Sequence, residues 1–417
     1  MEGYTFGEFF CGAGGMSWGA MKAAECPELT GAAHMRPVWA VDSSLDACAT
    51  YHANVHSGSG VFAKESGGGS VPGIDAPMDG DTLVLAADVR RVQPHLLRRV
   101  DGFMFGFPCN DFSSAGQRKG LDGDFGLLYQ QARALLVAHR PLFFVAENVS
   151  GLLNANDYGA FSRIIEDLRL ENSSVDGAAD GYEVVPHLYR FEEYGIPQTR
   201  HRIMIVGIRK DVAAALPRGF RPPAPSGRIR TAGEALRNPP IPDWAANNES
   251  YPMSDAVRRR LQFIAPGQNI WDVNEFIPSD LRLKQTNKTI SSIYRVLDEN
   301  RPAYTVIGNG GGGTYMYHWS KRTTTNRERA RFQTFDDCFA FHGSASSVRR
   351  QIGMAVPPEG ARIVVEALLK TLKGIEYPSV EPNLAQALDP SMIEKRRDKA
   401  ARSRGRKNRS TGLGQAA

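Results

Sequence analysis

A short apolar segment that runs directly into a Pro-Cys step constrains this chain most. Residues 102–107 have the pattern of a buried strand in an α/β protein, and residues 113–126 have that of a polar, glycine-containing loop. Pro108 and Cys109 stand between them. Open α/β sheets bind ligands at the carboxyl ends of their strands. We therefore expect Cys109 at a ligand-binding edge of the sheet, where its thiol can attack a substrate. A small buried apolar cysteine is the alternative, and this peptide alone leaves both open.

The N-terminal segment predicts a turn that suits a nucleotide-like ligand. Residues 5–10 have the pattern of a first strand, and a helix is expected over residues 16–25. The turn between them contains Gly12, Gly14 and Gly15. Glycines at this place let the backbone approach a ligand closely and leave amide groups free at the helix start. Dinucleotide-binding folds share such turns, so this signal alone is weak.

Two aspartates follow the next two predicted strands. Asp42 ends the second strand, residues 37–41, and Asp88 ends the third, residues 82–87. A carboxylate in the position of Asp42 can accept hydrogen bonds from ribose hydroxyls, although it can also cap the helix expected over residues 45–54. Asp88 is a plausible partner for the amino group of an adenine. Together with the glycine turn, these acids indicate a doubly wound sheet that holds an adenosyl group.

A third acid and two arginines lie further along the chain. A fourth strand is expected over residues 141–146, and Glu147 ends it, next to the cysteine-bearing strand. A turn or helix cap is the alternative for this carboxylate. Residues 182–208 predict a β-ribbon and another sheet strand. Arg200 and Arg202 are two residues apart there, so in an extended segment both side chains lie on one face and suit a phosphate, a carboxylate or a base oxygen.

Composition narrows the class of protein. A chain of 417 residues with 42% hydrophobic and 23% charged residues is typical of a globular protein with two domains. Its five cysteines are odd in number and lack metal-ligand spacing, which disfavours a disulfide framework and a zinc site. No apolar run is long enough to span a membrane, and residues 1–4 lack a signal-peptide pattern. We therefore expect a cytoplasmic protein, associated with the nucleoid of a bacterium, and no membrane partner.

Charge is concentrated at the C-terminus. The formal net charge is +5, but residues 394–409 carry nine Lys and Arg against two acids, which leaves the rest of the chain near −2. Any positively charged groove for nucleic acid must then arise from local clusters of Lys and Arg. The triplet Arg258-Arg259-Arg260 could meet phosphates or form a solvated face. Residues 57–81 are expected to be a surface loop, and beyond Gly374 no apolar pattern predicts folding.

The peptide around Cys109, Gly-Phe-Pro-Cys-x-x-Phe-Ser, resembles the nucleophile motif of the DNA (cytosine-5) methyltransferases, and other motifs of that family follow in its order. Glu147 resembles the invariant glutamate of the family, and Arg200 with Arg202 resembles its eighth motif. Residues 291–313 are similar to the ninth motif and residues 349–358 to the last. The cofactor implied by this resemblance is S-adenosylmethionine, and its site would comprise Phe10, Gly12, Gly14, Gly15, Asp42, Asp88, Pro108, Ala355 and Val356.

The resemblance also implies a fold and a domain organisation. We expect a doubly wound mixed sheet, the fold of S-adenosylmethionine-dependent methyltransferases, with a smaller, irregular target-recognition domain. The catalytic domain would be discontinuous, with residues 1–208 joined by residues 345–374. Residues 209–344 would recognise the target, and residues 375–417 would form a basic, disordered tail. Ser43 stands where many relatives have a bulky residue against the adenine, and Met354 where the family usually has asparagine.

The implied reaction is methyl transfer to carbon-5 of a flipped-out cytosine in a short, specific duplex DNA sequence. Cys109 would form a covalent bond to carbon-6, and Glu147 would hold the ring nitrogen N3 and the exocyclic amine. Arg202, helped by Arg200, would contact the base oxygen, and residues 113–126 would close as a lid. A monomer is expected, together with a restriction endonuclease that acts on the same site without forming a stable complex.

Two other functions remain open at this point. An RNA (tRNA) cytosine-5 methyltransferase would share the same catalytic motifs, although the long recognition stretch favours DNA. A catalytically silent, DNA-binding regulator would keep the fold, although the joint presence of Cys109, Glu147, Arg200 and Arg202 disfavours it. Methylation of an exocyclic amine would require an Asp/Ser-Pro-Pro-aromatic motif, which residues 107–109 do not match.

Overall fold

A computed structural model describes residues 3–29, 34–56, 60–64, 81–107, 124–153, 159–170, 181–283, 293–308 and 316–385. Its centre is an eight-stranded mixed sheet with the order β3-β4-β2-β1-β5-β6-β9-β7, in which β9 alone runs antiparallel to its neighbours. The strands are β1 (Tyr4–Phe9), β2 (Met35–Asp42), β3 (Val61–Lys64), β4 (Leu83–Ala86), β5 (Gly102–Gly106), β6 (Phe143–Val149), β7 (Tyr182–Arg190) and β9 (His201–Arg209). The predicted doubly wound mixed sheet is confirmed.

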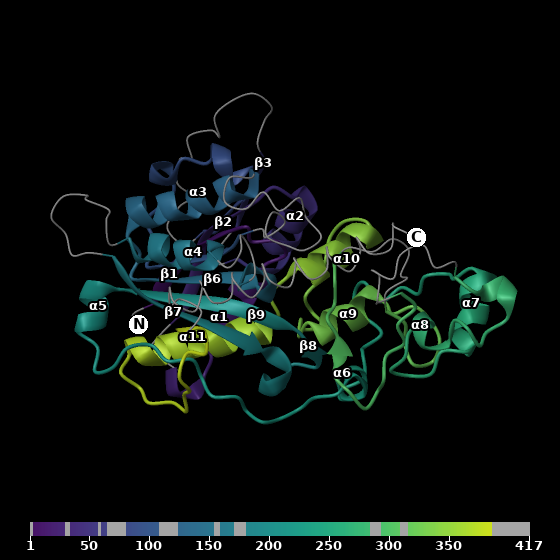
Figure 1. The fold of residues 1–417 in the computed structure, drawn as a ribbon. Helices are drawn as coiled ribbons and strands as arrows, with labels where there is room; N and C mark the ends of the chain where they lie inside the picture. The colour runs from purple at the N-terminus through teal and green to yellow at the C-terminus, as the bar shows by residue number, and fades with distance from the viewer. Residues whose placement is uncertain are drawn as a thin grey trace, which may run out of the picture.

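Helices cover both faces of this sheet (Figure 1). Along β5, Phe103 and Phe105 pack on one face with α3 (Asp124–His139) and α4 (Ala160–Arg169), while Met104 packs on the other. This alternation follows from the two-residue period of a strand. The second face is covered by α1 (Gly15–Ala23), α2 (Leu45–Asn54) and α11 (Pro358–Leu372). Both faces are therefore apolar, as a mostly parallel sheet requires.

Helices α1 and α11 approach each other unusually closely. A Cβ atom at Gly19 would lie 2.2 Å from the carbonyl oxygen of Pro358, and one at Gly15 would lie 2.3 Å from that of Val356. Since Gly15 and Gly19 are four residues apart, they lie on the same side of α1. Two glycines on one helix face thus let a segment near the C-terminus return to the first helix of the chain.

The remaining described residues form an irregular part beside the sheet (Figure 1). It contains the short parallel pair β8 (Gln198–Thr199) and β10 (Ala303–Tyr304), and the helices α6 (Ala232–Arg237), α7 (Asp255–Gln262), α8 (Ile270–Val273), α9 (Asn326–Phe332) and α10 (Ala345–Met354). Helix α5 (Lys210–Ala214) lies apart from it and packs against β7 and β9 of the large sheet. Its far end, with α7 and α8, has its own apolar core around Leu261, Ile264 and Tyr317. This part has the irregular texture that the sequence predicts; the domain limits themselves stay a prediction.

Helix α9 is polar in sequence and yet buried at every position. Its Arg327 donates hydrogen bonds to three backbone oxygens, those of Ala246, Asp336 and Phe339, at 2.7 to 2.9 Å. Glu328 forms a capping box with Thr325 at the start of the helix. Buried charges are tolerated only where such partners exist, so α9 cross-links the segments around it through polar bonds.

Three expectations are wrong in detail. Residues 61–64, inside the expected loop, form the edge strand β3, because Val-Phe-Ala-Lys favours a strand although its surroundings are rich in Gly, Ser and Pro. Strand β6 continues through Glu147 to Val149. Residues 375–385, expected to be disordered, pack on the large sheet: Leu384 enters its core, and the Asn383 amide bonds both Leu188 backbone groups of the edge strand β7.

Among the described residues, no helix combines the length and the apolar character needed to cross a lipid bilayer. The structure also describes α3 from Asp124 onward, so the first residues of this helix fall in the stretch that the sequence predicts to be a loop. The rest of the expected lid, residues 113–123, lies outside the described residues.

Replacing Gly19 by alanine tests the contact between α1 and α11. The new methyl group would overlap the backbone oxygen of Pro358, which cannot rotate away, so Gly19→Ala should lower the free energy of unfolding by about 1–3 kcal/mol. Urea denaturation measures this change. At the exposed Gly219, an added Cβ atom would lie 3.6 Å from Glu183 Oε2, which is an ordinary van der Waals contact. The free energy of unfolding of Gly219→Ala should therefore stay within about 0.5 kcal/mol of the wild-type value. Equal stabilities for the two variants would contradict the close approach.

Candidate active site

The carboxyl ends of the parallel strands open onto one cavity of about 590 Å³. Its wall contains Glu8, Phe10, Gly12, Gly15, Asp42, Asp88, Phe107, Glu147, Arg200, Arg202, Ala355 and Val356, among others. The fold thus brings together side chains from β1, β2, β5, β6, β9 and the C-terminal segment. Cys109 and Pro108, the predicted nucleophile and its neighbour, lie outside the described residues, and Phe107 is the last described residue before them.

The glycine turn has the backbone shape that its sequence predicts. Gly12 and Gly14 have φ values of 53° and 92°, in the left-handed region that favours glycine, and Phe10 has a φ of 56°. Gly14 is also the N-cap of α1 and supplies no side-chain hydrogen bond, so the first amides of this helix have no side-chain acceptor at the cap. Because Gly15 lines the cavity, these amides suit a negatively charged group there.

Asp42 connects the glycine turn to the start of α2. Its two carboxylate oxygens accept hydrogen bonds from the amides of Gly12, at 2.9 Å, and Ser44, at 2.8 Å. The cap of α2 is Ser44, whose hydroxyl accepts from the Ala47 amide, so Asp42 is not the capping residue. Each carboxylate oxygen keeps a further lone pair for a hydroxyl donor in the cavity. The structure therefore places Asp42 where a ribose contact is possible.

Asp88 lines the cavity, and its carboxylate forms an ion pair with Arg90. The Arg90 guanidinium donates to both carboxylate oxygens of Asp88, and this bond lowers the pKa of Asp88 below its ordinary value. At neutral pH Asp88 is consequently a pure acceptor. It can accept from an amino group, as the prediction for an adenine requires.

Glu147 and Arg202 form an ion pair inside the cavity. Arg202 Nε lies 2.8 Å from Glu147 Oε1, and the side chains of both residues are about one seventh exposed, at 14% and 13%. Burial raises the pKa of Glu147 above its ordinary value, and the charges of Arg202 and Arg200 oppose this rise. Glu147 is therefore a carboxylate that protonates more readily than an exposed glutamate and that stands beside two cations.

Arg200 lies close to this pair but is bonded elsewhere. Its guanidinium is buried and donates to the backbone oxygens of Val306 at 2.9 Å, Gly353 at 3.1 Å and Ala355 at 2.9 Å. The sequence predicts a second base-contacting arginine at this position. In the structure, Arg200 braces the cavity wall, and only its Nε is buried without a hydrogen-bond partner among the described residues.

Two buried polar residues near the cavity have no role in the sequence-based prediction. Asn148 donates to the backbone oxygen of Phe107 at 3.1 Å and so fixes the end of β5. Glu8 accepts from the Ser17 hydroxyl, which is also 2.7 Å from the Tyr51 hydroxyl, and burial raises the pKa of Glu8 to about 8. The signal for Glu8 is visible in the sequence as a single acid within an apolar strand.

The arginine triplet on α7 is largely occupied by contacts within its own part of the protein. Arg260 donates to the Leu281 oxygen and to the Tyr294 hydroxyl. Arg258 is 3.7 Å from Asp255, and Arg259 is 3.0 Å from Asp280. The alternative of a solvated, internally paired surface thus fits Arg258 and Arg259, while Arg260 is part of the packing around Tyr294.

Comparison with known proteins identifies the family. Residues 84–370 match the family model described as C-5 cytosine-specific DNA methylase. The chain belongs to this family. The Type II methyltransferase M.BbvI of Brevibacillus brevis is 44% identical over 382 residues, which cover 90% of this chain and 93% of that protein. M.NgoFVII of Neisseria gonorrhoeae is 37% identical, with 86% and 85% covered. The protein is thus a DNA (cytosine-5)-methyltransferase that uses S-adenosylmethionine as its methyl donor.

A solved structure supports the fold of this methyltransferase. A protein described as a DNA modification methyltransferase encoded within an E. coli prophage aligns with a TM-score of 0.61 over 89% of this chain and 99% of its own. The sequences are only 20% identical there, so this likeness concerns the fold alone. It agrees with the mixed sheet described above.

The hydrogen-bonding groups of the cavity fit S-adenosylmethionine. The uncapped start of α1 offers amides for a carboxylate, and Asp42 and Asp88 offer acceptors for hydroxyl and amino groups. Met354, which is 66% exposed, and Ala355 form part of the wall. They offer no polar side-chain atom that can form a strong hydrogen bond, so contacts from these two residues are limited to the backbone and apolar surface.

Glu8 makes the stability of the methyltransferase depend on pH. Its pKa is raised from 4.5 to about 8, so between these values the folded protein holds a proton that the unfolded chain releases. The free energy of unfolding therefore falls as the pH rises from about 5 to 8. The loss should be on the order of a few kcal/mol. In Glu8→Gln the amide stays neutral, and the fall in free energy of unfolding over this range, measured by urea denaturation, should be smaller. Parallel pH profiles for both proteins would contradict this assignment.

Proposed function

We propose that the methyltransferase modifies cytosine within one short duplex DNA sequence, with Cys109 as nucleophile and Glu147 and Arg202 as the residues that hold the base. The Glu147–Arg202 pair supports this proposal best, because it lies in the same cavity as Phe107, two residues before Cys109 in the chain. A carboxyl group with a raised pKa beside a fixed guanidinium matches one edge of a cytosine, which carries a ring nitrogen, an amino group and an oxygen.

The first step is addition of the Cys109 thiolate to carbon-6 of the cytosine ring. Carbon-5 of cytosine is a weak nucleophile, and a covalent bond at carbon-6 gives it the character of an enamine carbon. S-adenosylmethionine, when bound, would supply the electrophilic methyl group: carbon-5 bonds the methyl carbon, the bond from that carbon to the sulfonium sulfur breaks, and S-adenosylhomocysteine leaves. Removal of the carbon-5 proton by a base then allows the thiolate to leave, which restores the aromatic ring and the free cysteine.

Glu147 stabilises the charge that this addition creates. Electron density moves from the new bond towards N3, so a protonated carboxyl at N3 lowers the energy of the adduct. The raised pKa of Glu147 favours that protonated form. Its second oxygen would accept from the exocyclic amine, and Arg202, held at 2.8 Å from Glu147, would donate to the base oxygen.

Arg200 acts through its neighbours in this scheme. Its guanidinium is hydrogen-bonded to three backbone oxygens, and its charge opposes the rise that burial causes in the pKa of Glu147. Arg200 is therefore a positioning residue for the wall that includes Gly353 and Ala355.

Because the reacting atoms of cytosine lie inside the DNA stack, the base must leave the duplex, at a cost of about a few kcal/mol.

The names of two relatives support a biological setting for this activity. Both M.BbvI and M.NgoFVII are Type II methyltransferases by name. We infer that this chain also protects host DNA against a restriction endonuclease that cuts the same sequence and forms no stable complex with it. A monomeric protein in the bacterial cytoplasm, in contact with the nucleoid, is consistent with this role.

Base-resolution mapping of 5-methylcytosine tests the proposed function. DNA from cells that express the wild-type chain should carry the modification at one cytosine of one short sequence, and Cys109→Ala should leave all sites unmodified, because the thiolate is needed to activate carbon-5. Methylation spread without a sequence preference would refute the specificity. Methylation by Cys109→Ala at the wild-type level would refute the covalent mechanism.

Glu147→Gln tests the role of the carboxyl group. Glutamine can still form hydrogen bonds but cannot supply a proton to N3, so the rate of methyl transfer in single-turnover experiments should fall by roughly 10²–10⁴-fold. Duplex binding in a gel-shift assay should persist.

Glu192→Gln is the matched control. Glu192 is also a paired carboxylate, bound to His201 at 2.7 Å, but it does not line the cavity. This variant should keep a rate near that of the wild type. A similar loss in both variants would show that the effect of Glu147→Gln is general and not chemical.

A further inference from the structure

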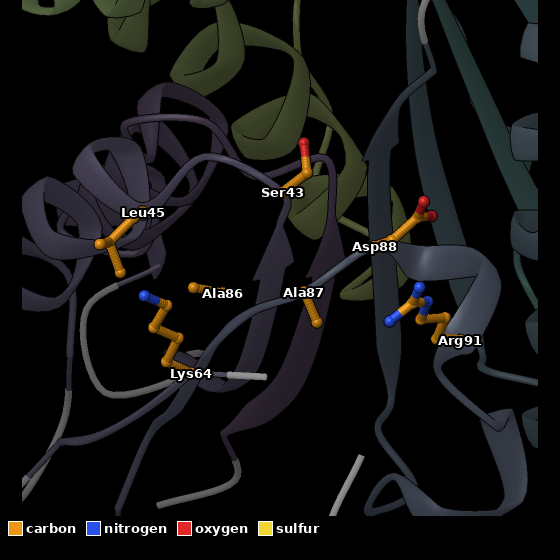
Figure 2. A pocket seen from close by; sticks show the side chains of 7 residues that line it. All are labelled: Ser43, Leu45, Lys64, Ala86, Ala87, Asp88 and Arg91. Atoms are coloured by element: carbon orange, nitrogen blue, oxygen red, sulfur yellow. The ribbon is translucent and has the colours of Figure 1, made fainter. Parts of the chain in front are cut away.

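A second cavity, of about 350 Å³, lies at the carboxyl ends of β3 and β4 (Figure 2). Ser43 and Asp88 line both this cavity and the active-site cavity, so the two spaces adjoin at these residues. Leu45, Lys64, Ala86, Ala87 and Arg91 form the rest of its wall. None of these five residues lines the active-site cavity.

Small side chains leave this second space open. Ser43 follows β2, and Ala86 and Ala87 stand at the end of β4, between Lys64 and Arg91 in the view of Figure 2. At the boundary between the two cavities, Ser43 offers only a hydroxymethyl group. An apolar cavity of about 150 Å³ is large enough to bind benzene. The space behind Ser43 therefore has room for an aromatic ring.

The position of Asp88 gives the direction in which a ligand would enter. Arg90 holds this carboxylate as an acceptor, and the sequence predicts that it accepts from the amino group of the adenine. That amino nitrogen has two hydrogens, so one can bond Asp88 while the other is replaced by a substituent. Since Asp88 belongs to both walls, such a substituent leads out of the first cavity and into the second.

We propose that the second cavity is an extension of the cofactor site, and that Ser43 lets the methyltransferase bind S-adenosyl compounds with an aromatic group on the adenine amino nitrogen. The inference rests on the proposed placement of the adenine beside Asp88. Leu45, Ala86 and Ala87 would contact the ring through apolar atoms, and the cationic side chains of Lys64 and Arg91 flank the space that it would fill. Cations next to an aromatic face are attracted to it.

Calorimetric titration of the purified full-length chain tests this inference without requiring catalysis. The probes are S-adenosylhomocysteine and its derivative with a benzyl group on the amino nitrogen. Wild-type protein should bind the two with dissociation constants within about tenfold of each other. Ser43→Trp, which fills the boundary, should weaken binding of the benzyl compound by about 30-fold or more relative to the unsubstituted one. Ser43→Ala, which keeps the boundary open, should keep the wild-type ratio of the two dissociation constants.

Leu45→Trp provides a second blocking variant, because Leu45 lines the second cavity and not the first. It should also discriminate against the benzyl compound while S-adenosylhomocysteine still binds. Wild-type binding of S-adenosylhomocysteine alone, with the benzyl compound more than about 100-fold weaker, would overturn the inference. Equal binding of both probes to both tryptophan variants would overturn it too, since the ring would then lie elsewhere. Failure of the wild type to bind either probe would instead refute the proposed cofactor site.

Discussion

The walls of the active-site cavity are joined by one buried guanidinium. Arg200 stands between β8 and β9 and donates to backbone oxygens from two other segments, at Val306 and at Gly353 and Ala355. Gln198 reinforces the same junction, since it accepts from the Val306 amide and donates to Gln333. A charge removed from water needs several partners, and each carbonyl needs a donor. Arg200 therefore holds in register three pieces of chain that are far apart in sequence.

This junction also governs the electrostatics of the cavity. Burial lowers the pKa of Arg200 and raises that of Glu147, because both charged forms lose hydration. The opposite charges of the two residues counteract both shifts, and Arg202 adds a second cation beside the carboxyl group. Glu147 is thus easier to protonate than an exposed glutamate, which favours its use as an acid towards a ring nitrogen.

Much of the fold and part of the site can be predicted from the sequence. The strands around Phe9, Val41 and Phe105 are apolar runs followed by glycines or acids, so their type and the place of Gly12 and Asp42 follow from local pattern. The structural role of Arg200 could not be predicted, because its partners are backbone atoms more than 100 residues away. The burial of helix α9 could not be predicted either, because the helix lacks an apolar stripe and its buried polar side chains form hydrogen bonds instead. Residues 375–385 are ordered by contacts with β7 that only the folded sheet provides.

The apolar core at the far end of the irregular part has a consequence for how such proteins diverge. Leu261, Ile264 and Tyr317 pack among themselves and share no residue with the clusters under the large sheet. Substitutions at distant, independent sites add without coupling. Changes around α7 and α8 consequently leave the packing at the strand ends undisturbed, and the two parts of the chain are free to evolve at different rates.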